Sequence, residues 1–259
     1  MYPVVFQLGP ITIYSFGLMV AAALFAGGLI VSQELRRKGL DPGLGWQITC
    51  WAAIGGLVGA RLWAMVDDFD RFLEAPVHFL LLGGGVVWYG GLVGGFLGAS
   101  WVIHQKRLPR LVATDCVAIA IPLAHAIGRI GCQLAGDGDW GATTTLPWGM
   151  SYPNAIIGWD YPPGVRVHPA PLYEAALYLG IFGLLWALRR RVERPGTILA
   201  LYFVLAGTAR FLIEYVRIEP RVLWGLTAAQ LFSVLLVAVG AALLYRVTPG
   251  DRPPRKLTG

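Results

Sequence analysis

Residues 111–141 have the sequence LVATDCVAIAIPLAHAIGRIGCQLAGDGDWG, and this stretch decides the fold that we predict. Its first part, up to Gly128, is almost entirely apolar and long enough to cross a bilayer. From Gly128 onward, the stretch combines Arg129, five glycines and the carboxylates Asp137 and Asp139. Ionisable side chains at membrane depth are costly, and they usually face partners, water or a bound molecule. We therefore expect an anion-binding site where a membrane-spanning helix ends.

The composition of the whole chain favours a membrane protein. Of its 259 residues, 56% are hydrophobic and 14% are charged, and the mean hydropathy is +0.60. A chain with this composition is too apolar for an ordinary soluble domain. We predict one all-α, polytopic integral-membrane domain over residues 1–259, with a long loop at about residues 131–169. The seven predicted transmembrane helices cover residues 11–31, 46–66, 77–103, 111–128, 170–188, 196–213 and 226–245.

The basic residues predict the orientation of the chain. The loops after the first, third and fifth spans and the C-terminal tail hold 14 Lys and Arg residues, and the other loops hold six. Because basic loops stay in the cytoplasm, we expect the N-terminus outside and the C-terminus in the cytoplasm. The net charge of +6 is then a topology signal, and we expect no nucleic-acid partner. No removable signal peptide is expected, since no basic segment precedes the first span.

The predicted third span contains eight glycines, from Gly83 to Gly98. The spacing Gly94-x-x-x-Gly98 lets helices approach closely in lipid, so the glycines favour helix packing. The alternative is a broken or re-entrant segment near residues 83–85. The three cysteines form no disulfide framework, and no Cys or His spacing predicts a metal site.

Charged residues from separate segments are predicted at one depth, near the outer ends of the spans. Arg210, Glu214 and Arg217 follow the i, i+4, i+7 spacing of one helix face. They are either structural ion pairs or part of a phosphate clamp, since a guanidinium fork matches phosphate oxygens. The same depth is predicted for Arg61, Arg129, His168, Tyr173 and Glu174.

Several of these residues have a structural interpretation as well as a functional one. Arg61 could pair with Asp67 or Asp68, and Asp137 and Asp139 could cap turns rather than orient Arg129. Glu174 falls in the first turns of a predicted helix, where a carboxylate suits the helix dipole. For Tyr89 we favour packing with an interhelical hydrogen bond. For His125 we favour a buried neutral side chain over a neighbour of the site.

Three motifs in series resemble those of bacterial phosphatidylglycerol–prolipoprotein diacylglyceryl transferases. They are Gly128-Arg129-Ile130-Gly131 with the Gly- and Asp-rich residues after it, His168-Pro169-x-x-Leu172-Tyr173-Glu174, and Arg210-Phe211-x-x-Glu214-x-x-Arg217. Gly59-Ala60-Arg61, Tyr89-Gly90-Gly91 and Gln230 also have counterparts. The resemblance covers nearly the whole chain and identifies it as a divergent member.

The resemblance implies transfer of the diacylglyceryl group of phosphatidylglycerol to the lipobox cysteine thiol of preprolipoproteins, with release of glycerol phosphate. It implies a bacterial inner-membrane enzyme, acting near the outer leaflet without a cofactor or metal. We expect a monomer whose partners are phosphatidylglycerol, other membrane lipid and the preprolipoprotein signal peptide. The implied catalytic residues are Arg129, Arg210, Glu214 and Tyr89. The implied substrate-binding residues are Arg61, Gly128, Gly131, Asp137, Asp139, His168, Tyr173, Glu174, Arg217 and Gln230.

The chain also departs from the family pattern. Tyr89 stands where the family carries a histidine, and Cys132 and Ala135 lie where the arginine–glycine motif continues with asparagines. A tyrosine is a weak base at neutral pH, so Tyr89 either acts through a hydrogen bond or leaves proton transfer to another residue. Two alternatives to diacylglyceryl transfer to prolipoproteins stay open. One is a related transferase with a different acceptor, and the other is a lipid-binding or lipid-moving membrane protein without catalysis.

Overall fold

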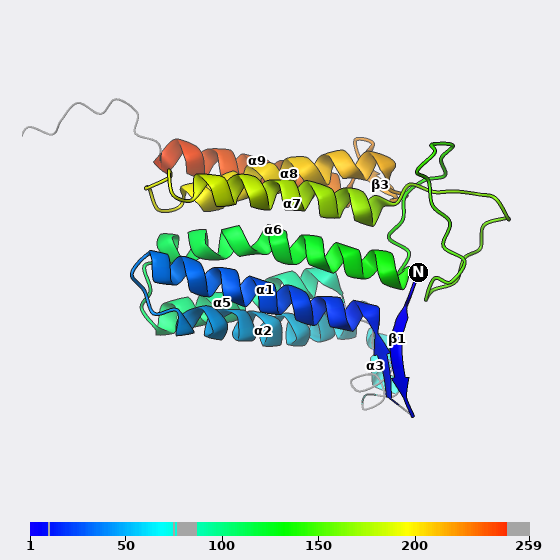
Figure 1. Cartoon of the computed structure of the whole chain (residues 1–259), viewed down its shortest axis with the longest axis horizontal. Helices are drawn as coiled ribbons and strands as arrows, with labels where there is room; N and C mark the ends of the chain where they lie inside the picture. Colours follow the sequence, from blue (N-terminus) through cyan, green and yellow to red (C-terminus); the bar gives the residue numbers. More distant parts are fainter. Residues whose placement is uncertain (10, 75, 77–86, 248–259) are drawn as a thin grey trace, which may run out of the picture. The chain divides into compact units, whose positions relative to one another are not determined.

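The structure is a computed structural model that describes residues 1–9, 11–74, 76 and 87–247. The described chain is mostly helical, with two short antiparallel hairpins (Figure 1). Six of the described helices are long and apolar enough to cross a membrane. They are α1 (Ser15–Arg37), α2 (Gly43–Asp67), α6 (Arg110–Ala135), α7 (Ala170–Leu188), α8 (Thr197–Ile213) and α9 (Ala228–Val247).

These helices confirm the polytopic helical fold, with differences at the first, third and fourth predicted spans. The third span is described only over α5 (Trp88–Gln105), and the alternative of a broken segment near residues 83–85 lies outside the described residues. Helix α6 continues past its predicted end at Gly128 to Ala135, so the loop begins at Gly136. The helix can continue because Arg129 is paired with carboxylates, and it ends where Gly136 adopts a positive φ of 65°.

The described residues form two compact units, Gly27–Cys116 and a larger one of Met1–Ala26 with Val117–Gly259. In the unit Gly27–Cys116, α2 and α5 pack through glycines. A Cβ atom at Gly55 or Gly59 would collide with the backbone oxygen of Gly94 or Gly90, respectively, and one at Gly98 would meet the backbone of Trp51. The helix-packing interpretation of the glycine spacing is therefore confirmed for these residues. The short helix α3 (Phe69–Glu74) follows α2.

In the larger unit, α7, α8 and α9 run side by side (Figure 1). Two strands, β1 (Val4–Leu8) and β2 (Ile11–Tyr14), form a hairpin before α1, whereas the sequence predicted a helix from residue 11. Residues 11–13 are Ile, Thr and Ile, which are all β-branched, and this suits a strand. A second hairpin, β3 (Arg221–Leu223) and β4 (Leu226–Thr227), leads into α9.

The loop between α6 and α7 is fixed to the end of α8. The 3₁₀ helix η2 (Glu214–Val216) follows α8, and Gly141 pairs with Arg217 just after it. The Ala142 amide donates to the Val216 carbonyl at 2.8 Å, and the Gly141 amide donates to the His168 carbonyl at 2.8 Å. These backbone contacts hold the loop residues around Gly141 between the end of α8 and the start of α7.

Candidate active site

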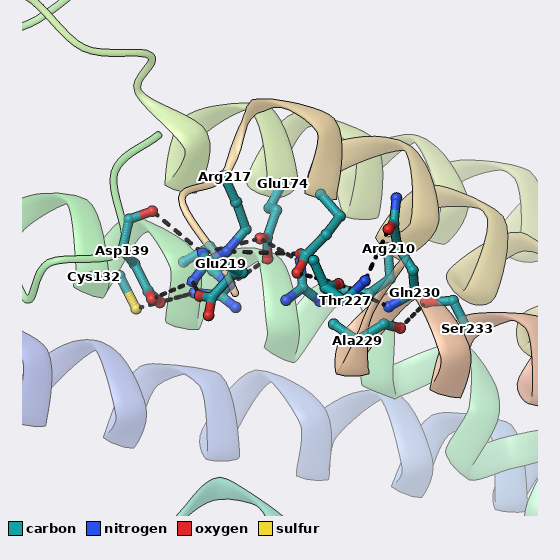
Figure 2. A network of polar contacts seen from close by, with 12 residues as sticks. Cys132, Asp139, Glu174, Arg210, Arg217, Glu219, Thr227, Ala229, Gln230 and Ser233 are labelled. Atoms are coloured by element: carbon teal, nitrogen blue, oxygen red, sulfur yellow. Dashed lines mark hydrogen bonds and ion pairs between the residues drawn. The ribbon is translucent and has the colours of Figure 1, made fainter. Parts of the chain in front are cut away.

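Six charged side chains of the larger unit form one network, which we name the ion-pair cluster. Helix α6, the following loop, α7, α8, η2 and the residue after η2 each contribute one of them. In Figure 2, Glu174, Arg210 and Arg217 converge, with Cys132 and Asp139 on one side and Thr227 and Gln230 on the other. The six members are Arg129, Asp139, Glu174, Arg210, Glu214 and Arg217.

Glu174 is the centre of the cluster. Its side chain is 1% exposed, and Oε2 lies 2.5 Å from Nε of Arg129. Its other oxygen, Oε1, lies 3.7 Å from Nη1 of Arg217 and 3.8 Å from Nη1 of Arg210. A carboxylate is rarely buried unless it is paired, and here one carboxylate faces three guanidinium groups. The sequence placed Glu174 in the first turns of a helix but did not indicate this central position.

Asp139 joins two arginines of the cluster. Its carboxylate pairs with Nη1 of Arg129 and, at 2.8 Å, with Nη2 of Arg217. Burial alone would raise the pKa of Asp139, but Arg129 and Arg217 outweigh it and hold the pKa below its usual value. Asp137 instead accepts a hydrogen bond from the Asp139 amide at 3.4 Å. Of the two candidate carboxylates, Asp139 is the one that contacts Arg129.

Arg210 and Glu214 form the expected i, i+4 pair, with Nη1 of Arg210 2.6 Å from Oε2 of Glu214. The prediction that Arg217 continues the same helix face was wrong, because α8 ends at Ile213. Arg217 has extended backbone angles, φ −85° and ψ 160°. It still joins the cluster, since its pairing with Gly141 brings its side chain to Asp139.

Thr227 and Gln230 support the cluster from the start of α9. The Thr227 hydroxyl donates to Oε1 of Glu214 at 2.7 Å. It also accepts from the Gln230 amide at 3.2 Å, while Oε1 of Gln230 accepts from the Thr227 amide at 3.2 Å. This reciprocal pattern is a capping box, which the sequence Thr-Ala-Ala-Gln could have revealed. Sequence reasoning missed Thr227, and it gave Gln230 a substrate-binding role that stays a prediction.

His125 is a neighbour of the cluster, and its side chain is partly exposed rather than fully buried as we favoured. Its side chain is 25% exposed, and Nε2 lies 3.5 Å from Oε2 of Glu174 and 3.4 Å from Nε of Arg129. The ring also stacks on Tyr178, with 3.8 Å between ring centroids. The four-residue spacing from Arg129 places both side chains on one face of α6, which explains the contact.

The His168 motif forms a separate set of polar contacts. Nδ1 of His168 lies 3.3 Å from the Tyr173 hydroxyl, which also accepts a hydrogen bond from Nε1 of Trp148 at 2.8 Å. Both residues belong to the larger unit, as does the cluster. Their predicted contact with substrate remains a prediction.

Four other predicted site residues, Gly128, Gly131, Arg61 and Tyr89, are not members of the ion-pair cluster. A Cβ atom at Gly131 would lie 2.9 Å from Cβ of Met19, so close packing against α1 explains this glycine, while Gly128 faces open space. Arg61 in α2 and Tyr89 in the first turn of α5 belong to the unit Gly27–Cys116. Their membership of the site stays a prediction.

One group of described side chains has potential metal-binding atoms close together. Atoms of Cys132, Asp137 and Asp139 lie within 4.8 Å of one another. However, both carboxylate oxygens of Asp139 contact arginines, and Sγ of Cys132 lies 3.8 Å from Nη1 of Arg129. Because guanidinium groups repel a cation, these residues do not fit a metal. Three arginines on separate segments instead favour an anion with several oxygens, such as a phosphate.

Comparisons with known proteins agree with an enzyme that acts on a phospholipid. The family model of prolipoprotein diacylglyceryl transferase matches residues 3–246. Similar proteins named phosphatidylglycerol–prolipoprotein diacylglyceryl transferase include one from Clostridioides difficile, 33% identical over 92% of this chain and 92% of the relative. Another, from Thermosynechococcus vestitus, is 30% identical over 95% of this chain and 93% of the relative. The chain therefore belongs to the prolipoprotein diacylglyceryl transferase family.

Proposed function

We propose that the ion-pair cluster is the active site at which this chain transfers the diacylglyceryl group of phosphatidylglycerol to the cysteine thiol of a prolipoprotein. Diacylglyceryl transfer is the activity of the family to which the chain belongs. The observation that carries the assignment is the position of Glu174, whose carboxylate contacts both Arg129 and Arg210. One anionic group can therefore reach both guanidinium groups at once.

Arg210 retains hydrogen-bond donors for a phosphate. Its Nη1 atom contacts Glu214 and Glu174, whereas its Nε and Nη2 atoms make no hydrogen bond or ion pair within the described part of the chain. The Arg210 side chain is 23% exposed, more than Arg129 at 17% or Arg217 at 9%. Phosphate oxygens at Arg210 would replace water rather than a carboxylate, which lowers the cost of binding.

The chemistry of the reaction requires positive charge at this position. The thiol loses its proton, and sulfur forms a bond to the glyceryl carbon that carries the phosphate. The bond between that carbon and the phosphate oxygen breaks, and its electron pair stays on the oxygen of the departing glycerol phosphate. Negative charge therefore increases on the phosphate, where fixed guanidinium groups stabilise it most in the transition state.

The members of the cluster have distinct proposed roles. Arg129 and Arg210 bind the phosphate and stabilise the leaving group. Glu214 orients Arg210, and Asp139 orients Arg129, consistent with the contacts described above. Additional substrate contacts are proposed for Arg61, Tyr89, Gly128, Gly131, Asp137, His168, Tyr173, Arg217 and Gln230.

The proposed membrane placement follows from the charge distribution along the sequence. With basic loops in the cytoplasm, the end of α6 and the start of α7 lie near the outer leaflet. Phosphatidylglycerol headgroups and the lipobox cysteine would meet the cluster at that depth. We propose that the two compact units act together as one integral-membrane domain and that the chain works as a monomer.

The proposed site is tested with the purified full chain in phosphatidylglycerol vesicles and a synthetic lipobox peptide. The unmodified chain should give a thioether-linked peptide, detected by its mass, with an equal amount of glycerol phosphate. Arg129→Lys and Arg210→Lys should each lower kcat/KM by about 100-fold or more. Lysine keeps the positive charge but cannot make the bidentate hydrogen bonds that a guanidinium group makes to phosphate oxygens.

Arg166→Lys is the matched control. Arg166 is an exposed arginine of the loop between α6 and α7 and has no ion pair in the described part of the chain, so its replacement should leave the rate unchanged. Full activity in either cluster variant would overturn the site assignment. Lipid binding by the unmodified chain without turnover would favour the non-catalytic alternative.

A further inference from the structure

The reaction needs a group that removes the proton from the thiol, and this requirement rests on the proposed function. A thiol attacks far more readily as a thiolate, and its ordinary pKa of about 8.5 leaves only a small fraction ionised at neutral pH. Carboxylates are weak bases at that pH, and a carboxylate that accepts a proton loses its ion pair. Asp139, Glu174 and Glu214 all pair with arginines. The cluster's own carboxylates are therefore poor proton acceptors.

His125 meets the requirements for this group. Among the described histidines, His125 is the one whose ring contacts both an arginine and a carboxylate of the cluster, through Nε2. Nε of Arg129 donates toward Nε2 at 3.4 Å, which suits a lone pair there, whereas the Glu174 carboxylate 3.5 Å away suits a proton. In the tautomer that donates to Glu174, the lone pair of the ring is on Nδ1. Nδ1 makes no hydrogen bond or ion pair with another residue among residues 1–9, 11–74, 76 and 87–247. With 25% of the side chain exposed, the ring is accessible to a substrate.

We propose that His125 accepts the proton of the prolipoprotein thiol during diacylglyceryl transfer. The S–H bond breaks, the proton binds to the lone pair on Nδ1, and sulfur keeps the electron pair with which it attacks the glyceryl carbon. The carbon–oxygen bond to the phosphate then breaks as the carbon–sulfur bond forms. Glu174 fixes the ring through Nε2 and stabilises the imidazolium, in the way that a carboxylate supports histidine in hydrolytic triads.

The groups around His125 influence the pH at which it works. Glu174 on α7 favours the protonated ring, and Arg129 on α6 opposes it. Arg210 on α8 also opposes the protonated ring, from further away, because its guanidinium group contacts Glu174 rather than His125 itself. Tyr178 on α7 stacks on the ring and adds no charge while its hydroxyl stays protonated. The ring therefore has charged neighbours of both signs, on α6, α7 and α8.

The test is the pH dependence of kcat for the full chain in phosphatidylglycerol vesicles with a lipobox peptide, from about pH 5.5 to pH 9. The unmodified chain should lose activity as the pH falls, because a protonated imidazole cannot accept a proton. His125→Gln should lower kcat at pH 7 by about 100- to 10,000-fold, with KM for the lipid nearly unchanged. Its remaining rate should rise with pH toward the thiol pKa of about 8.5, because hydroxide then removes the proton.

A structural role of His125 predicts different results. If the ring only holds Arg129 and Glu174 in place, His125→Gln should raise KM and keep the shape of the pH profile. Chemical rescue separates the two roles further, because added imidazole should restore activity to His125→Ala only if a proton acceptor is missing. His104→Gln is the matched control, since His104 is an exposed residue of α5 and should tolerate the change.

Two outcomes would overturn the assignment. One is a His125→Gln variant that has the kcat of the unmodified chain and the same loss of activity at low pH. The other is that the activity of His168→Gln no longer falls at low pH while that of His125→Gln still does, which would make His168 the proton acceptor. Failure of the proposed function is distinguishable from both, because the unmodified chain would then give no thioether at any pH.

Discussion

Glu174→Gln removes a negative charge from a side chain that is 1% exposed and contacts three arginines. The amide keeps the size of the side chain, so the change isolates the charge. Arg129, Arg210 and Arg217 then lose their shared partner while remaining partly or fully enclosed. Removing one partner of a buried ion pair costs about 3–5 kcal/mol, because the remaining charge is left uncompensated. We expect a large loss of thermal stability in detergent, together with loss of transfer.

Glu219→Gln is the matched control for this prediction. Glu219 also pairs with Arg217, at 2.9 Å, but its side chain is 39% exposed. An exposed ion pair contributes about 0–1 kcal/mol, so this variant should unfold close to the temperature of the unmodified chain. The measurement is thermal unfolding of the two variants and the unmodified chain in the same detergent. Equal unfolding temperatures for Glu174→Gln and Glu219→Gln would refute the claim that Glu174 is the central carboxylate.

Further predictions concern the contacts that support the cluster and two residues of the unit Gly27–Cys116. Thr227→Val should lower kcat more than Thr227→Ser, because only serine keeps the hydroxyl that bonds Glu214 and caps α9; equal rates in a transfer assay would contradict this. Because its pKa is lowered, Asp139 should stabilise the fold above about pH 4 and lose this effect as the pH falls through the lowered pKa. Unfolding temperatures of the unmodified chain and Asp139→Asn should therefore converge in acid. Gly94→Leu should destabilise the chain by separating α5 from α2, seen as a lower unfolding temperature. Tyr89→Phe should slow transfer if its hydroxyl takes part, and an unchanged rate would make Tyr89 a packing residue.

The spans were predictable because long apolar runs leave the backbone few options in lipid. Helix α7 has the predicted bounds, and α8 and α9 begin within two residues of theirs. The end of α6 was not predictable from apolarity. The sequence predicts the end of this span at Gly128, just before Arg129, but the partners of Arg129 on other segments allow the helix to continue to Ala135. These partners are brought to Arg129 by tertiary packing, which the apolar pattern of a single segment does not indicate.

The members of the site were easier to predict than their contacts. Topology and motif resemblance selected Arg129, Arg210 and Glu174, which the structure brings into one network. The sequence could not tell which of two nearby aspartates contacts Arg129, because positive φ angles at Gly136 and Gly138 and the pairing of Gly141 decide it. The position of Glu174 between three arginines likewise depends on how α6, α7 and α8 pack.

We propose that Arg129 and Arg210 bind one phosphate of phosphatidylglycerol. This proposal is tested most directly by an experimental structure of the full chain with this lipid bound, in which the distances from both guanidinium groups to the phosphate oxygens are measured. We predict nitrogen–oxygen distances of about 2.7–3.2 Å from both arginines to the same phosphate. A phosphate that contacts only one of them, or neither, would show that the two arginines do not form a shared phosphate site.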